Sequence, residues 1–147
     1  LSPIIDGFNG EVISYNLSQT PNLKQTKAML QNAFSKYESL EDLILHSDQG
    51  WQYQHQWYQA TLKEKKVIQS MSRKGNSLDN GMMESFFSRL KVEMFYGEES
   101  NFDTIEDLTL AIHQYIEYYN NKRIKSILKG LSPVQYRNQV LQNLNNN

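Results

Sequence analysis

Two acidic residues stand where a carboxylate could take part in chemistry. Asp48 closely follows a short apolar run at residues 43–45. Ligand sites in open α/β sheets gather just beyond the carboxyl ends of strands, so Asp48 is predicted to face a crevice. Glu84 lies one turn into a helix that is predicted to run from about residue 80 to Tyr96. Simpler roles stay open: Asp48 could cap the helix that begins near Trp51, and Glu84 could interact with a helix dipole.

The two carboxylates together suggest a function that neither suggests alone. Magnesium prefers oxygen ligands, and a strand-end carboxylate can converge with one on a downstream helix to bind such an ion. Two ions about 3.5–4 Å apart can hold the attacking and leaving oxygens of a phosphodiester, as in nucleases and strand-transfer enzymes. The chain has no cysteine, which excludes disulfides, thiolate metal sites and cysteine nucleophiles. Its three histidines lack zinc spacing, and His55 and His113 are expected on the surface or in helix packing.

The elements that must position these carboxylates follow from the hydrophobic pattern. Two β-rich runs at residues 2–6 and 11–17 are parted by a turn rich in Gly and Asn, which predicts a hairpin. Residues 43–45 and 67–68 are short strand candidates. Helices are predicted after Pro21, over residues 51–64, up to Tyr96, after Thr104 and after Pro133. Strands joined by helices imply a parallel portion of sheet with an antiparallel hairpin at one edge.

Apolar stripes predict which helix faces are buried. On the helix that carries Glu84, the residues that share an apolar face are Met83, Phe87, Leu90 and Met94. On the helix after Thr104, three tyrosines could pack in the core or stack on nucleic-acid bases, and their helical spacing favours packing: Tyr115, Tyr118 and Tyr119.

Length and charge bound the remaining possibilities. The 147 residues allow one domain of ordinary size, and no apolar run is long enough to span a bilayer. The net charge of -1 hides two basic zones: residues 61–91 carry seven basic and three acidic residues, and residues 120–147 carry five basic residues and no acid. Residues 92–119, between them, carry seven acids and no base. The basic zones could form a nucleic-acid surface or be ordinary solvated faces, and both interpretations stay open.

Several motifs follow one another in a fixed order. They are HSDQGWQY at residues 46–53, SMSRKGNSLDN at 70–80, ESFF at 84–87 with LK at 90–91, YYN at 118–120 and GLSP at 130–133. Together they resemble the catalytic core of bacterial insertion-sequence transposases, the relatives of retroviral integrase. The resemblance extends from Leu1 to about Tyr136. The order of several motifs makes it specific, whereas each motif alone is weak.

The resemblance implies an α/β fold, a ribonuclease-H-like mixed sheet flanked by helices. It also implies an Asp-Asp-Glu metal triad with Asp48 as the second member and Glu84 as the third; thirty-five residues lie between them, the interval usual in the family. Arg73, Lys74 and Lys91 match positions expected to contact DNA, where a phosphate contact gives affinity without sequence specificity. The implied cofactor is Mg²⁺ or Mn²⁺, with two ions in the complete site.

The sequence also departs from the family pattern. The first aspartate of the triad belongs to a strand expected roughly a dozen or more residues before Leu1. Asp6 corresponds to a hairpin turn and not to the triad, and Gln49 stands where relatives often have arginine. We therefore expect a sheet that lacks its first, central strand, with the hairpin either paired to the strand at 43–45 or split from it. Residues 1–141 are then an N-terminally truncated integrase-like core, and residues 142–147 are a polar, frayed tail.

The implied activity is that of a DNA transposase, a metal-dependent phosphoryl transfer that cleaves and joins strands. Its partners are transposon ends and target DNA, it is expected to pair with further copies of itself, and its location is the bacterial cytoplasm at the nucleoid, without a membrane. With the first aspartate absent, this fragment is expected to be inactive by itself. Two alternatives stay open: a non-catalytic DNA-binding or dimerising remnant, and a hydrolase acting on RNA or hybrid duplexes.

Overall fold

The computed structural model of this chain describes residues 1–73 and 80–146. Lys74, which the sequence analysis assigned to DNA contact, and Asp79, near the predicted start of a helix, lie outside the described residues. The chain divides into two compact units. The first comprises Leu1–Ile4 and Ser14–Glu84, and the second comprises Ile5–Ile13 and Ser85–Asn147.

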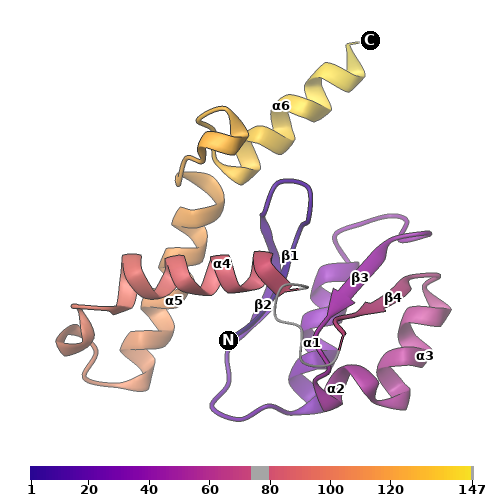
Figure 1. Ribbon diagram of the computed structural model, residues 1–147, viewed down its shortest axis with the longest axis horizontal. Coiled ribbons are helices and arrows are strands. Elements are labelled where there is room, and N and C mark those ends of the chain that lie inside the picture. Colours follow the sequence, from indigo (N-terminus) through magenta and orange to yellow (C-terminus); the bar gives the residue numbers. More distant parts are fainter. Residues whose placement is uncertain (74–79, 147) are drawn as a thin grey trace. The chain divides into compact units, whose positions relative to one another are not determined.

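The first unit is built around a parallel strand pair. Strand β3 (Ile44–Ser47) pairs with β4 (Ile68–Met71), with Ile44 opposite Ile68 and Ser47 opposite Met71. Figure 1 shows the pair beside helices α1 (Leu23–Phe34), α2 (Trp51–Gln54) and α3 (Gln56–Glu64). The crossover from β3 to β4 runs through α2 and α3, as expected for parallel strands. The predicted parallel portion of sheet is therefore confirmed.

A small apolar core holds this unit together. Its buried members come from α1, α3 and the residue just before β4, and they are Leu30, Tyr58, Leu62 and Val67. Part-buried side chains pack around them, among them Leu45 of β3 and Tyr53 of α2. The core therefore ties the strand that precedes Asp48 to the two helices that follow it.

The sequence predicted one helix over residues 51–64, and this prediction is wrong at His55. His55 has an extended backbone (ψ 138°) that separates α2 from α3. Its ring Nδ1 accepts a hydrogen bond from the Trp57 N–H (3.1 Å), so His55 caps α3. A hydrophobic pattern does not reveal this break, because a histidine at position 55 is also compatible with a continuous helix.

The hairpin at the start of the chain is confirmed. Strands β1 (Ser2–Ile5) and β2 (Val12–Asn16) pair, and the Asp6 carboxylate accepts from the Phe8 N–H (2.7 Å) inside the turn. The Gly10 N–H donates to the Asp6 carbonyl (2.8 Å). Asp6 is thus a turn residue, as predicted. Among the described strands, β1–β2 and β3–β4 are two separate two-stranded sheets, so the split alternative is the one observed.

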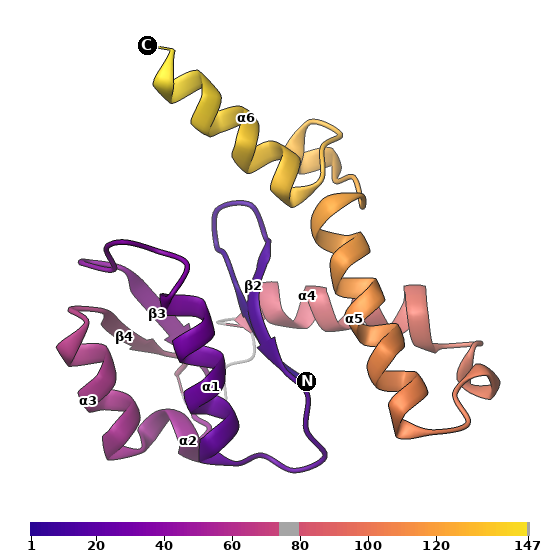
Figure 2. The same cartoon turned by 180° about the vertical axis from the view of Figure 1, so that it is seen from behind.

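The second unit is helical. Helix α4 (Gly81–Leu90) continues into the π-helical turn η2 (Lys91–Phe95), close to the predicted end of that helix. It is followed by η3 (Glu99–Asn101), α5 (Ile105–Asn121), η4 (Ser126–Leu128) and α6 (Pro133–Asn145). Figure 2 shows α5 and α6 joined through the η4 segment. None of the helices in the described part of the chain is long and apolar enough to cross a membrane.

The buried face of α4 differs from the predicted stripe. Phe86 is 1% exposed and Leu90 is 7% exposed, whereas Phe87 and Met83 are only half-buried. The Phe86 ring meets the Tyr119 ring edge to face, with centroids 5.1 Å apart. The packing of Tyr119 of α5 against α4 therefore buries Phe86, which the stripe analysis left out.

Capping residues define the remaining helices. Thr104 and Asp107 form a capping box at the start of α5, and Ser132 and Gln135 form another at the start of α6. The predicted burial of tyrosines on α5 holds for Tyr115 and Tyr119; Tyr118 is 46% exposed. Helix α6 continues through Asn145, so residues 142–145 of the predicted polar tail are helical. Local sequence did not predict this helical extension, because Asn is a weak helix former.

Candidate metal and nucleic-acid site

Asp48 lies immediately after β3, at the carboxyl end of a parallel strand. Its carboxylate Oδ1 accepts a hydrogen bond from the Gly50 N–H (2.8 Å), and the Ser47 hydroxyl donates to the Asp48 carbonyl (3.1 Å). The side chain is exposed. The N-cap residue of α2 is Gly50, so α2 begins without a side-chain cap. The helix-capping role considered for Asp48 is therefore wrong, because its carboxylate closes a local turn before the helix starts.

Gly50 leaves room for this arrangement. A Cβ at this position would lie 2.9 Å from the Asp48 carboxylate and 2.8 Å from the Gln52 side chain. Both distances are shorter than real Cβ contacts. A side chain at position 50 would therefore displace the Asp48 carboxylate or the end of the Gln52 side chain from the positions they have here.

Side chains on both sides of Asp48 attach to the end of β4. The His46 ring contacts two serine hydroxyls, with Nδ1 2.9 Å from Ser70 Oγ and Nε2 3.0 Å from Ser72 Oγ. Gln49 donates to the Ser72 carbonyl (2.6 Å). The Ser72 N–H donates to the Ser47 carbonyl (2.8 Å). Gln49, where relatives often have arginine, thus has a structural role in this chain.

Tyr53, an aromatic residue close to the Asp48 turn, is part-buried. Burial raises the pKa of Tyr53; a hydrogen bond from Gln52 acts against that rise, and the negative charge of Asp48 adds to it. The Tyr53 ring packs against Tyr58 of the core, with centroids 5.4 Å apart. Trp51, the other aromatic near Asp48, is 55% exposed. Tyr53 therefore packs on the core of the first unit, while Trp51 remains accessible to solvent.

Glu84 lies in the first turn of α4, and its side chain is exposed. It belongs to the same compact unit as Asp48. Within residues 1–73 and 80–146, no three His, Asp or Glu side chains form a group that could hold a metal ion. Magnesium is commonly bound by one or two carboxylates together with substrate phosphates, and two exposed carboxylates fit that donor set. The convergence of Asp48 and Glu84 on one ion stays a prediction.

The residues predicted to contact DNA are only partly described. Arg73 is exposed and follows Ser72, and Lys91 is exposed at the start of η2. Both are placed on the surface, as phosphate contacts require. Lys74 lies outside the described residues.

A charged cluster in the second unit was missed by the sequence analysis. The Arg123 guanidinium donates from Nε to both Glu93 carboxylate oxygens (2.9 and 2.7 Å), and the Tyr115 hydroxyl donates to Glu93 (2.9 Å). The hydrogen bond from Arg123 lowers the pKa of Glu93, and the same bond raises the pKa of Arg123. Burial raises the pKa of Tyr115, and Glu93 adds to that rise. The sequence carries no signal for this cluster, because its members lie on separate elements.

Lys125 lies beside this cluster and is half-buried. Its Nζ donates to the Tyr119 hydroxyl (2.8 Å) and lies 4.3 Å from the centroid of the same ring. It also reaches the Gly10 carbonyl (3.4 Å). Burial lowers the pKa of Lys125 to about 8, and the positive charges of Arg123 and Arg89 act in the same direction.

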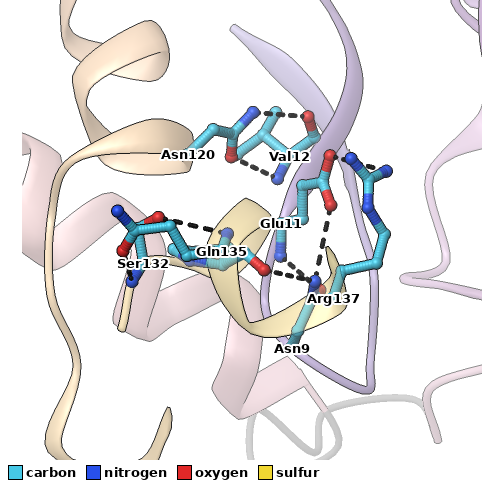
Figure 3. Close-up of polar contacts among 8 residues, drawn as sticks. Asn9, Glu11, Val12, Asn120, Ser132, Gln135 and Arg137 are labelled. Carbon is cyan, nitrogen blue, oxygen red and sulfur yellow. Dashed lines mark hydrogen bonds and ion pairs between the residues drawn. The ribbon is translucent and has the colours of Figure 1, made fainter. Parts of the chain in front are cut away.

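The last two motifs of the sequence hold the hairpin turn in place. Figure 3 shows Asn120 of α5 directed at the backbone of Val12, and Arg137 of α6 directed at Glu11. The ion pair between Arg137 Nη1 and Glu11 Oε1 measures 3.2 Å, and the Glu11 side chain is 9% exposed. The Asn9 side chain donates to the Pro133 carbonyl (3.0 Å). In this structure, the YYN and GLSP motifs are therefore packing and capping motifs.

Comparison with known proteins agrees with this architecture. Residues 1–77 and 84–141 each match a family model described as "Integrase core domain". The chain is 55% identical over 141 residues to an "Uncharacterized transposase-like protein" of Haemophilus influenzae, covering 96% of this chain and 64% of that protein. It is also 55% identical over 140 residues to the "Putative transposase InsK for insertion sequence element IS150" of Escherichia coli, covering 95% and 49%. The chain thus spans about half to two thirds of the length of these relatives.

A solved structure supports the fold independently. The magnesium complex of the HTLV-2 integrase catalytic core domain, in its trimeric form, matches with a TM-score of 0.68. The match covers 90% of this chain and 80% of that one at 18% sequence identity. At that identity the likeness shows the fold alone, and it confirms the predicted α/β, integrase-type class.

Proposed function

We propose that this chain, which belongs to the integrase core domain family of insertion-sequence transposases, forms part of the phosphoryl-transfer centre of a DNA transposase. The observation that carries the proposal is the placement of Asp48. Its carboxylate follows a parallel strand, is oriented by the Gly50 N–H and remains exposed. This is the position in an α/β sheet where catalytic groups are usually found.

Asp48 and Glu84 are the residues that would hold Mg²⁺ or Mn²⁺, with two ions in the complete site. When bound, such ions lower the pKa of a water or 3′-hydroxyl and stabilise the leaving oxygen of the phosphodiester. The contribution of this chain is to hold the two carboxylates ready and to orient them. No side-chain nucleophile is needed, so no covalent protein–DNA intermediate is expected.

We also infer that the complete sheet contains a further, central strand carrying the first aspartate of the triad. Two observations support this inference. The described strands form two separate two-stranded sheets, which is fewer strands than a stable sheet usually has. Ile44 of β3 and Ile68 of β4 are 63% and 50% exposed, so apolar side chains of the parallel pair lack cover within the described structure. An added strand and its neighbours would bury this surface.

DNA is the proposed partner, with Arg73, Lys74 and Lys91 as phosphate contacts. The HTLV-2 integrase catalytic core domain in complex with magnesium has been solved in a trimeric and a dimeric form. We infer that this chain also pairs with copies of itself, with residues 1–141 as its core. The corresponding location is the bacterial cytoplasm, at the nucleoid.

A second candidate is a non-catalytic DNA-binding role for this chain by itself. It is favoured by the exposed basic residues Arg73 and Lys91, whose charge attracts phosphates without a metal. Metal binding separates the two candidates. A catalytic centre requires it, and a DNA-binding remnant does not.

The test is a calorimetric titration of Mn²⁺ into the chain. We expect binding by the unsubstituted chain, and loss of binding in Asp48→Asn and Glu84→Gln. Glu106→Gln is the matched control, because Glu106 is also an exposed glutamate in the first turn of a helix. Equal binding by Asp48→Asn and the control would contradict the proposal. In a transposase that contains this chain, joining of DNA ends, and not only hydrolysis, distinguishes a transposase from a hydrolase of RNA or hybrids.

A further inference from the structure

The turn that carries Asp48 is attached on both sides to a single buried residue, Ser72. Ser72 is 5% exposed and lies just beyond β4. Its hydroxyl contacts His46, two residues before Asp48, and its carbonyl accepts from Gln49, the residue after Asp48. Its N–H donates to the carbonyl of Ser47. All three polar groups of Ser72 are therefore used to hold residues 46–49.

His46 is suited to this bridge by its place in the sheet. His46 and Ser70 are register partners in the parallel pair. Side chains alternate along a strand, so Ser70 and Ser72 extend to the same side. A neutral imidazole has one donor and one acceptor nitrogen, and a serine hydroxyl can serve as either partner. One ring can therefore bond both hydroxyls at 2.9 and 3.0 Å, whichever nitrogen carries the proton.

We propose that His46, Gln49 and Ser72 form a positioning clamp for the Asp48 carboxylate, an inference that rests on the proposed metal-binding function. Asp48 is exposed, so packing does not restrain its side chain. The restraint comes from a backbone pinned before and after it, and from the Gly50 N–H that holds one carboxylate oxygen. Residues that orient a metal ligand without touching the metal affect affinity because they restrict the ligand to its binding geometry.

Removal of the clamp side chains would have a different effect if their role were purely structural. Strand pairing between β3 and β4 is already provided by the backbone register from Ile44 to Ser47. If the side chains only reinforced the sheet, their loss would lower overall stability and leave the Asp48 turn unchanged. If they position Asp48, their loss loosens the turn and weakens metal binding while the core stays folded.

The variants are Ser72→Ala and His46→Ala, with His46→Gln as the conservative replacement. Glutamine retains a donor and an acceptor, so it can keep part of the bridge. Ser35→Ala is the matched control, because the Ser35 hydroxyl also bonds a carbonyl, that of Asn32 at the exposed end of α1. Two quantities are measured on the full chain: Mn²⁺ affinity, and the exchange rate of the Gly50 amide hydrogen by NMR without metal.

We expect Ser72→Ala and His46→Ala to bind Mn²⁺ about 10-fold more weakly, the lower end of losses seen for groups that orient metal ligands. Their Gly50 amide should exchange severalfold faster, relative to the amide of buried Leu30 in the same sample. His46→Gln should recover part of both changes, and Ser35→Ala should match the unsubstituted chain.

Unchanged Mn²⁺ affinity and unchanged Gly50 exchange in folded Ser72→Ala and His46→Ala would overturn the clamp while leaving the proposed function intact. Absence of Mn²⁺ binding by the unsubstituted chain would instead contradict the proposed function. The Gly50 exchange rates would then decide by themselves whether the clamp orders the Asp48 turn. A rise of Leu30 exchange in both alanine variants would mean that they destabilise the core. The Mn²⁺ affinity and Gly50 exchange of His46→Gln, compared with the unsubstituted chain, would then decide.

Discussion

Asn120 pairs with both backbone groups of Val12. Its side-chain oxygen accepts from the Val12 N–H and its side-chain nitrogen donates to the Val12 carbonyl, each at 2.9 Å (Figure 3). The Asn120 side-chain amide thus forms the two hydrogen bonds that a neighbouring strand would form with Val12 of β2. This contact joins the end of α5 to the hairpin across 108 positions of sequence.

Replacing Asn120 with alanine should destabilise the chain by about 1–3 kcal/mol, because the substitution removes both partners of a part-buried backbone pair. Denaturant unfolding followed by circular dichroism measures the change. Asn121→Ala is the control, since the side-chain hydrogen bonds of Asn121 to described residues stay within α5, at Glu117. A loss no larger than that of the control would show that the Val12 pairing contributes little.

Glu93 should make stability depend on pH in the acid range. Its pKa is lowered in the folded chain by the hydrogen bond from Arg123, so its contribution is fully present above the ordinary value of 4.5 and is lost as pH falls through the folded value. In Glu93→Gln, stability should fall less steeply below pH 4.5 than in the unsubstituted chain. Chemical unfolding at a series of pH values measures the slopes. Identical slopes would exclude a folded-state contribution from the Arg123 pair.

Lys125 should also make stability rise with pH, but in the alkaline range. Its folded pKa of about 8 lies below the ordinary 10.5, so the unfolded chain binds more protons between these values and stability should rise with pH there. Lys125→Met should remove this rise, whereas Lys122→Met, which changes an exposed lysine, should retain it. The difference in unfolding free energy between variant and parent, measured from pH 7 to pH 10, is the test. A constant difference would show that Lys125 titrates normally.

Gly10 should not tolerate alanine. Its φ of +72° is a conformation that side chains disfavour, and an added Cβ would lie 2.7 Å from Lys125 Nζ. Gly10→Ala should therefore cost about 1–2 kcal/mol from the left-handed backbone alone. Gly7→Ala in the same turn is the control, because its φ is not positive and no described atom lies within 4 Å of the added carbon. Thermal unfolding of both variants tests this prediction: the melting temperature of Gly10→Ala should be the lower one. Equal melting temperatures would contradict the prediction.

Local signals predicted most of the elements correctly. The hairpin turn around Asp6, the helix starts near Thr104 and Pro133 and the strand before Asp48 follow from neighbouring residues, and each is observed. Where a partner from another element decides, the same reasoning was wrong. Phe86 is buried because Tyr119 packs on it, and periodicity along α4 contains no information about that ring.

The candidate site divides in the same way. The sequence by itself determined that a carboxylate, Asp48, follows a short strand and that the ordered motifs resemble an integrase core. Only the tertiary structure decided that His46 and Gln49 meet Ser72, and that Asn120 meets Val12. These pairs are hydrogen bonds between residues more than twenty positions apart. Such bonds exist only after the chain has folded, so no local preference of the separate residues can predict them.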